Sequence, residues 1–322
     1  MIPWSLRSVG NFLNAYGDPW LFRSVLATRP IETDPSSSVG VHSAVPHRYI
    51  LAYLTAIKSF LRFEAGVAVY VHDDGSLTED DKSLVRVHVP GATIVERAAA
   101  DARFEREIGD AFLSQVRRSY TSYLKLFDPT LISDKKKIII VDTDVLFLHR
   151  PAEVIDWIES GKGAWFHQAR SWRGAKKAST KPPDAAQGGG GGHIQRLVTE
   201  RIDEINAALG TEFAFMAGFN SGFVGYENGT VDFAKLKKLL GYLHGRLGDK
   251  IFKWGAEQTM HGLTLCGAGA VALSPDDYLV FSSLNAGQAD AARFVHFIGE
   301  FRYHRFIYPR LAWRTNRQLP RS

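Results

Sequence analysis

The chain has 322 residues, of which 45% are hydrophobic and 23% are charged, as in an ordinary globular protein with a substantial core. Cys266 is the only cysteine, which excludes an intramolecular disulfide and a cysteine-rich zinc site. The formal net charge of +5 is a mild excess spread along the chain, so it favours anionic ligands in general and does not predict nucleic-acid binding.

The N-terminal segment, residues 1–38, is rich in aromatic residues but is interrupted by charges, glycine and proline. It therefore does not have the apolar core of a signal peptide. No stretch of the chain approaches the roughly 20 apolar residues of a transmembrane span. We expect a cytoplasmic protein without a transmembrane segment, in which this segment is an arm that packs on the main domain.

Strand and helix patterns alternate from residue 39 onward. Strands are predicted at 39–45, 67–72, 92–95 and 137–141, and helices at 48–63, 78–87 and 104–127. This order is typical of an α/β protein with a doubly wound, mainly parallel sheet and helices on both faces.

The second half of the chain continues with a helix from residue 151, a strand at 164–167, and helices at 194–209, around 233–243 and at 257–265. Short strands are predicted near Val271 and Tyr278, and residues 303–322 form a basic tail. Residues 170–193 carry five basic residues, two prolines and five consecutive glycines, which predicts a flexible loop. This loop is either a disordered insertion or a basic lid over an anionic ligand.

The most informative segment is the apolar strand that ends at Val141 and leads into Asp142, Thr143 and Asp144. Carboxylates at the end of a buried strand need a cation, a ligand or solvent, and ligands bind at the carboxyl ends of strands in open α/β sheets. Alternation in an extended chain points Asp142 and Asp144 to the same side, with Thr143 opposite. Two hard oxygen donors on one side suit Mg²⁺ or Mn²⁺, so we predict a divalent-metal site.

His296 lies between apolar residues and is either a core histidine or a further metal ligand, since imidazole suits Mn²⁺. Gly299, close behind it, would let the backbone approach a phosphate.

Three further positions have two interpretations each. Asn220-Ser221-Gly222 is either a strand-end turn or a polar pair in use, because buried polar groups need partners. Glu257-Gln258 reflects either a functional pair or the preference for negative charge at a helix N-terminus. Lys125 is either a surface lysine or a phosphate contact.

Together these segments resemble nucleotide-sugar glycosyltransferases of the GT-A fold, nearest to glycosyltransferase family 8 and its relatives. The matching segments occur in the family order within residues 39–302: Tyr123 to Leu126, Ile140 to Phe147, Phe219 to Phe223, Glu257-Gln258 and His296 to Gly299. The resemblance implies a GT-A domain over residues 39–302, with a mixed, mainly parallel sheet.

The resemblance also implies roles for individual residues. Asp142, Asp144 and His296 match the ligands of a Mn²⁺ or Mg²⁺ ion that binds the diphosphate of a donor, usually a UDP-sugar. The other donor contacts fall on Lys125, Thr143, Ser221, Gly299 and Arg302. The catalytic positions fall on Glu257, which faces the donor sugar, and on Gln258 and Asn220, which touch the sugar or the diphosphate. Members of the family retain the anomeric configuration without requiring a carboxylate nucleophile. The acceptor, which is a glycan, a protein or a lipid, and the oligomeric state are left open.

The sequence departs from the family at three places. Residues 46–49 read Pro-His-Arg-Tyr, where relatives carry an acidic residue and an asparagine beside the base, which puts the preference for uridine in doubt. The lysine that usually follows the last glycine is absent, and Arg302 is its expected substitute. Glu257 stands where aspartate is commoner.

Two other functions fit parts of the sequence. A haloacid-dehalogenase-type phosphohydrolase would use Asp142 as its nucleophile and Asp276-Asp277 as a later acidic pair, although its motif normally opens the domain and here follows three strand–helix units. A non-catalytic sugar- or nucleotide-binding protein on a degenerate transferase scaffold is the third possibility.

Overall fold

The computed structural model describes residues 4–169 and 194–321, so the predicted flexible loop at 170–193 lies outside the described residues. The strands are β1 Val39–Val45, β2 Ala68–Asp73, β3 Thr93–Val95, β4 Lys137–Val141, β5 Val145–Phe147, β6 Trp165–Gln168, β7 Phe219–Glu227, β8 Val271–Ala272, β9 Tyr278–Val280 and β10 Phe294–His296. The helices are α1 Trp4–Tyr16, α2 Asp18–Leu21, α3 Ile50–Leu61, α4 Glu79–His88, α5 Arg97–Glu107, α6 Ala111–Ser119, α7 Tyr123–Ile132, α8 Ala152–Glu159, α9 Ile194–Thr199, α10 Ile202–Leu209, α11 Phe233–Leu247, α12 Ala256–Gly267 and α13 Ile307–Gln318.

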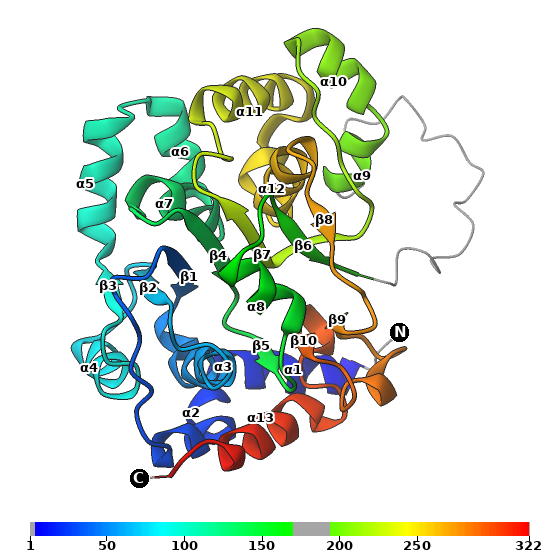
Figure 1. The fold of residues 1–322 in the computed structure, drawn as a ribbon. Helices are drawn as coiled ribbons and strands as arrows, with labels where there is room; N and C mark the ends of the chain where they lie inside the picture. Colours follow the sequence, from blue (N-terminus) through cyan, green and yellow to red (C-terminus); the bar gives the residue numbers. More distant parts are fainter. Residues whose placement is uncertain (1–3, 170–193, 322) are drawn as a thin grey trace.

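The main sheet has seven strands in the order β3-β2-β1-β4-β7-β6-β8, and every strand except β7 runs in the same direction. A second sheet has the order β5-β10-β9, with β10 antiparallel to β5 and parallel to β9. Helices lie on both sides of the main sheet (Figure 1). The prediction of a mixed, mainly parallel α/β sheet is therefore confirmed.

Strand β4 is apolar after Lys137 because both of its faces are covered. Ile139 and Val141 belong to one cluster of buried residues, which includes α3 and the small sheet. Ile138 and Ile140 point the other way, into a cluster formed with α7, α11 and α12. A strand buried on both faces cannot carry polar side chains without partners, so the next polar residue after Lys137 is Asp142, which comes only where the strand ends.

The prediction of one helix over residues 104–127 is wrong, because this region contains the end of α5, all of α6 and the first half of α7. Gly109 has a φ of +56°, which a glycine adopts readily and which ends α5. The Asp110 carboxylate then accepts a hydrogen bond of 2.9 Å from the Leu113 N–H and caps α6. The predicted helix at 194–209 is likewise divided, into α9 and α10.

The two ends of the chain contain helices that meet around α3. The Asp18 carboxylate of α2 accepts hydrogen bonds from the Leu51 and Ala52 N–H groups at 2.9 and 2.8 Å, which satisfies the first turn of α3. On α13, the Asn316 side chain donates to Ser24 Oγ at 3.0 Å. Helices α2 and α13 accordingly lie together at the bottom of Figure 1.

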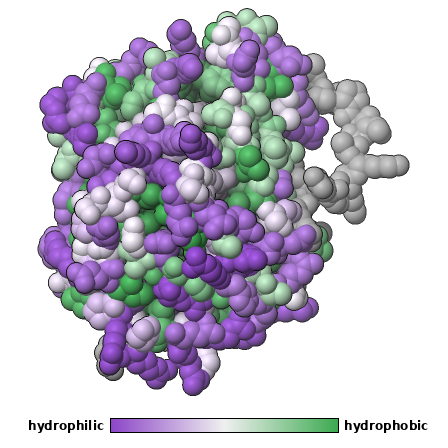
Figure 2. Space-filling view, viewed as in Figure 1, coloured by the Kyte–Doolittle hydropathy of each residue, from purple (hydrophilic) through white to green (hydrophobic). Residues whose placement is uncertain are grey.

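None of the helices in the described ranges combines the length and the apolar character that crossing a membrane requires. The face shown in Figure 2 is mainly hydrophilic, with hydrophobic residues gathered in small groups between polar ones.

We predict that Arg117 of α6 is essential for holding α5, α6 and α7 together. Its guanidinium, only 1% exposed, bonds both Asp128 oxygens at 2.6 and 3.0 Å and pairs with Asp101. Removing one partner of a buried ion pair costs about 3–5 kcal/mol, so Arg117→Met should lower the free energy of unfolding by this amount in urea titrations. The neighbouring Arg118 pairs with Glu105 at the surface, and Arg118→Met should cost less than about 1 kcal/mol. Equal losses in the two variants would contradict the prediction.

Candidate active site

A cleft of about 900 Å³ opens where β1 and β4 end and β7 begins. Its walls include every site residue that the sequence predicted, which the structure therefore brings together: Lys125, Asp142, Thr143, Asp144, Asn220, Ser221, Glu257, Gln258, His296, Gly299 and Arg302. The carboxyl ends of strands are the usual ligand site of an open α/β sheet.

Asp142, Asp144 and His296 converge in this cleft. His296 Nε2 lies 3.1 Å from Asp144 Oδ1 and 3.6 Å from Asp142 Oδ2. One ligand atom from each of the three residues lies within 4.8 Å of the others, which is compact enough for a shared ion. Two carboxylates and an imidazole nitrogen form a donor set that fits Mn²⁺ well and Mg²⁺ through its oxygens.

Gly222 leaves the space that His296 occupies. A Cβ atom built on Gly222 would lie 2.1 Å from His296 Cε1 and 2.9 Å from Asp142 Oδ2, both inside contact distance. The Asn220 side-chain oxygen accepts a hydrogen bond of 2.8 Å from the Gly222 N–H, and the Gly222 carbonyl accepts one of 2.9 Å from the Asp142 N–H. The Asn-Ser-Gly segment therefore lies inside β7 and is not a turn, and its polar side chains have partners beside the place where the two aspartates and His296 meet.

Lys125 connects the acidic pair with Glu257. Its ammonium donates to Asp142 Oδ1 at 2.7 Å and lies 3.8 Å from Glu257 Oε2. Burial opposes the ionised form of Glu257, but the charge of Lys125 and a hydrogen bond of 2.7 Å with His261 Nδ1 outweigh it and lower the carboxyl pKa. Ser221 Oγ donates to Glu257 Oε2 at 3.3 Å. Glu257 is therefore an ionised carboxylate held in place by three partners. It lies in the first turn of α12, where the resemblance places an acidic residue.

Arg302 binds the second aspartate. Its guanidinium pairs with Asp144 Oδ2, donates to Asn14 Oδ1 at 3.1 Å and lies 4.9 Å from the centre of the Tyr49 ring. Burial opposes ionisation of Asp144, but the charge of Arg302 and the contact with His296 outweigh it and lower the pKa of Asp144. Thr143, between the two aspartates, lines the cleft, and its carbonyl accepts a hydrogen bond of 3.4 Å from Tyr308.

Gly299 has a φ of +54°, in the left-handed region that favours glycine, and it turns the chain from β10 into the 3₁₀ turn Gly299–Phe301. Gln258 lies beside Glu257 in the first turn of α12, with its Oε1 at 3.5 Å from the Ser221 N–H.

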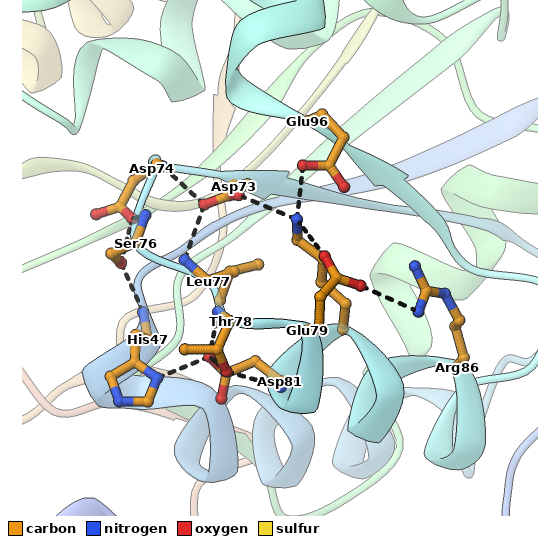
Figure 3. Close-up of polar contacts among 12 residues, drawn as sticks. His47, Asp73, Asp74, Ser76, Leu77, Thr78, Glu79, Asp81, Arg86 and Glu96 are labelled. Atoms are coloured by element: carbon orange, nitrogen blue, oxygen red, sulfur yellow. Dashed lines mark hydrogen bonds and ion pairs between the residues drawn. The ribbon is translucent and has the colours of Figure 1, made fainter.

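The part of the cleft after β1 is lined by residues 46–49 and by Asp74. The His47 N–H donates to Ser76 Oγ at 2.9 Å, and its ring Nδ1 lies 2.7 Å from Asp81 Oδ2 (Figure 3). The carboxylate that lines this part of the cleft is Asp74, from the turn after β2, and it accepts hydrogen bonds from Ser76. An acidic side chain is therefore present here, but it comes from a different strand end.

Several residues that support the site were not predicted from the sequence. His167 contacts His296, His261 contacts Glu257, and Asn14 contacts Arg302. His167 is the last residue of the strand predicted at 164–167, and a polar residue at a strand end is a signal that could have identified it. Asn14 carries no such signal, because the contact spans almost the whole chain.

Comparison with known proteins bears on the fold. No protein-family model matches the chain, and no curated protein matches its sequence. Among solved structures, the chain is similar to the bifunctional glycosyltransferase WbbM, with a TM-score of 0.51, 12% identity, and coverage of 88% of this chain and 50% of that one. It is also similar to an active-site mutant of LgtC, with a TM-score of 0.50, 14% identity, and coverage of 87% and 96%. The protein has the GT-A fold that the sequence predicted, whereas family 8 stays a prediction.

We predict that Gly222→Ala weakens metal binding. The new Cβ would displace the His296 ring or the Asp142 carboxylate, and either shift disturbs the ligand set. We expect the Mn²⁺ affinity, measured from the EPR signal of free Mn²⁺, to fall by about tenfold or more. Gly241→Ala is the control, because nothing lies within 4 Å of its Cβ position on α11. Unchanged Mn²⁺ affinity in Gly222→Ala would show that this close approach does not shape the site.

Proposed function

We propose that this protein is a metal-dependent glycosyltransferase that moves a sugar from a nucleoside-diphosphate sugar to an acceptor with retention of configuration. One observation carries the proposal: two aspartates and a histidine nitrogen meet at the strand ends, and each aspartate is paired with a buried or nearly buried cation. The similarity in fold to WbbM and LgtC, both glycosyltransferases, supports it.

Asp142, Asp144 and His296 would hold a Mn²⁺ or Mg²⁺ ion. Such an ion supplies a Lewis acid that neutralises the charge on a diphosphate leaving group. Besides such an ion, the side chains of Lys125 and Arg302 bring positive charge to the cleft. Lys125 and Arg302 each lie against an aspartate and line the cleft, so their N–H groups are available to phosphate oxygens.

Glu257 would face the donor sugar. Positive charge develops at the anomeric carbon as the bond to the diphosphate breaks, and a carboxylate held ionised by Lys125 and His261 would stabilise that charge. Asn220 and Gln258 would contact sugar hydroxyls, and Ser221 and Thr143 would complete the donor site. We assign no nucleophile, since the mechanism of the family does not require a carboxylate in this role.

The donor is proposed to be a UDP-sugar on the resemblance alone. Asp74 and His47 would lie near the base, in place of the residues that relatives use there. A phosphohydrolase with Asp142 as nucleophile has less support, because the solved structures that share this fold are glycosyltransferases.

The first test is nucleoside-diphosphate binding. UDP, GDP and ADP are compared in thermal-shift assays with and without Mn²⁺. A ligand at 100 times its Kd stabilises the wild-type protein by about 2.7 kcal/mol, and Asp144→Ala should abolish this response. Asp290→Ala is the control. It too removes an aspartate that pairs with arginine, but Asp290 pairs with Arg310 and Arg314 at the surface, outside the cleft.

No response to any nucleoside diphosphate with Mn²⁺ would overturn the proposal. Release of phosphate from simple phosphomonoesters would instead favour the phosphohydrolase. Binding of UDP-, GDP- or ADP-sugars without hydrolysis or transfer would favour the non-catalytic binding protein.

The second test concerns Glu257. Glu257→Gln keeps the shape of the side chain but removes its charge, so turnover of the donor sugar should fall by about 100-fold. Mn²⁺-dependent binding of the nucleoside diphosphate should persist, because Lys125 keeps its bond to Asp142. Released nucleotide measures turnover, with water as acceptor where no other is known. Glu153→Gln is the matched control, since this carboxylate accepts a hydrogen bond from Tyr278 outside the cleft. Full turnover in Glu257→Gln would remove it from the chemistry.

A further inference from the structure

A chain of hydrogen bonds runs behind the candidate metal position. His167 Nδ1 lies 3.0 Å from the backbone carbonyl of Phe223, and His167 Nε2 lies 3.1 Å from His296 Nδ1. The other nitrogen of His296, Nε2, faces Asp144 and Asp142. The two imidazoles therefore link the main-chain carbonyl of β7 to the carboxylates.

The carbonyl fixes the direction of this chain. A backbone carbonyl can only accept, so the proton of His167 is on Nδ1. The ring of His167 is fully buried against Phe223 and Phe294, which disfavours its charged form. In the neutral ring, Nε2 is an acceptor, and the His296 nitrogen that faces it must donate.

We propose that His167 is a positioning residue that holds a proton on Nδ1 of His296 and thereby directs the Nε2 lone pair of His296 at a metal ion between Asp142 and Asp144. The inference rests on the proposed metal-dependent function. It assigns His167 no contact with the ion or the donor. Its effect is to select the one neutral form of His296 that can be a ligand through Nε2.

The backbone around His167 is shaped to make this contact. Strands β6 and β7 pair Phe166 with Val224, but the register shifts at the next residue, and His167 pairs with Asn220. Such irregularities re-aim side chains and are common beside functional sites. Gly222, in the segment skipped by this shift, leaves room for the His296 ring to meet His167. The same irregularity therefore serves both histidines.

The test compares two substitutions of His167. Protein prepared without metal is titrated with Mn²⁺, and binding is measured by EPR. His167→Leu removes the acceptor, and the affinity should fall by about 10–100-fold. His167→Gln keeps an oxygen that accepts from His296 Nδ1 and an amide that donates to the Phe223 carbonyl, so most of the affinity should return. A role in packing alone predicts no such rescue.

The matched control is His42→Leu. His42 is also buried in an imidazole–imidazole contact, with Nδ1 at 2.9 Å from His72 Nε2, but it does not line the cleft. Its replacement should leave Mn²⁺ affinity unchanged. Thermal unfolding of each variant shows that the loss of affinity is measured on folded protein.

A second readout does not require the metal. In ¹⁵N NMR of the metal-free protein, Nδ1 of His296 should carry a proton in the wild type and in His167→Gln. In His167→Leu the proton should be confined to Nε2, because this nitrogen still faces Asp144 and Asp142. Wild-type affinity in folded His167→Leu, or a His296 Nδ1 without a proton in the wild type, would overturn the inference. If the wild type binds no Mn²⁺, the proposed function fails, and the NMR measurement still decides the role of His167.

Discussion

The cost of burying two carboxylates governs the arrangement of this molecule around its cleft. Asp142 and Asp144 follow a strand covered on both faces, where an ionised group without a partner would be costly. Three segments far apart in the sequence meet this demand: Lys125 from α7, His296 from β10, and Arg302 after the 3₁₀ turn Gly299–Phe301. Replacing buried ion pairs with apolar residues is often neutral or stabilising. Such a network is therefore better explained by ligand binding than by stability.

The small sheet is what brings His296 to the aspartates. Strand β5 begins directly after Asp144 and pairs with β10 so that Val145 lies opposite His296. The Phe297 N–H then donates to the Asp144 carbonyl at 2.8 Å. Phe147 and Phe294 pack with ring centres 5.0 Å apart, and a slip of one residue between the strands would place these two rings on opposite faces of the sheet. Aromatic packing in the core thus fixes the register, and the register fixes the distance between ligands.

The parts of this design that have a local signal could be predicted from the sequence. The apolar run before Asp142 gave the central strand, and the family resemblance joined His296 to the aspartates. The breaks after α5 and before α6 depend on Gly109 and on the cap by Asp110, and helical periodicity alone passes over them. The contact of His167 with His296 depends on a register shift between β6 and β7. The two residues are 129 positions apart, and no local sequence pattern predicts such a shift.

Each aspartate divides its two oxygens between different partners. Asp142 gives Oδ1 to Lys125 and turns Oδ2 toward His296, and Asp144 gives Oδ2 to Arg302 and turns Oδ1 toward the same nitrogen. The cations therefore orient the carboxylates from outside without using the oxygens that face His296. An ion bound by those inner oxygens and by Nε2 would not have to displace Lys125 or Arg302. Both cations would then remain beside the ion, where the negative charge of a diphosphate can offset the crowding of positive charge.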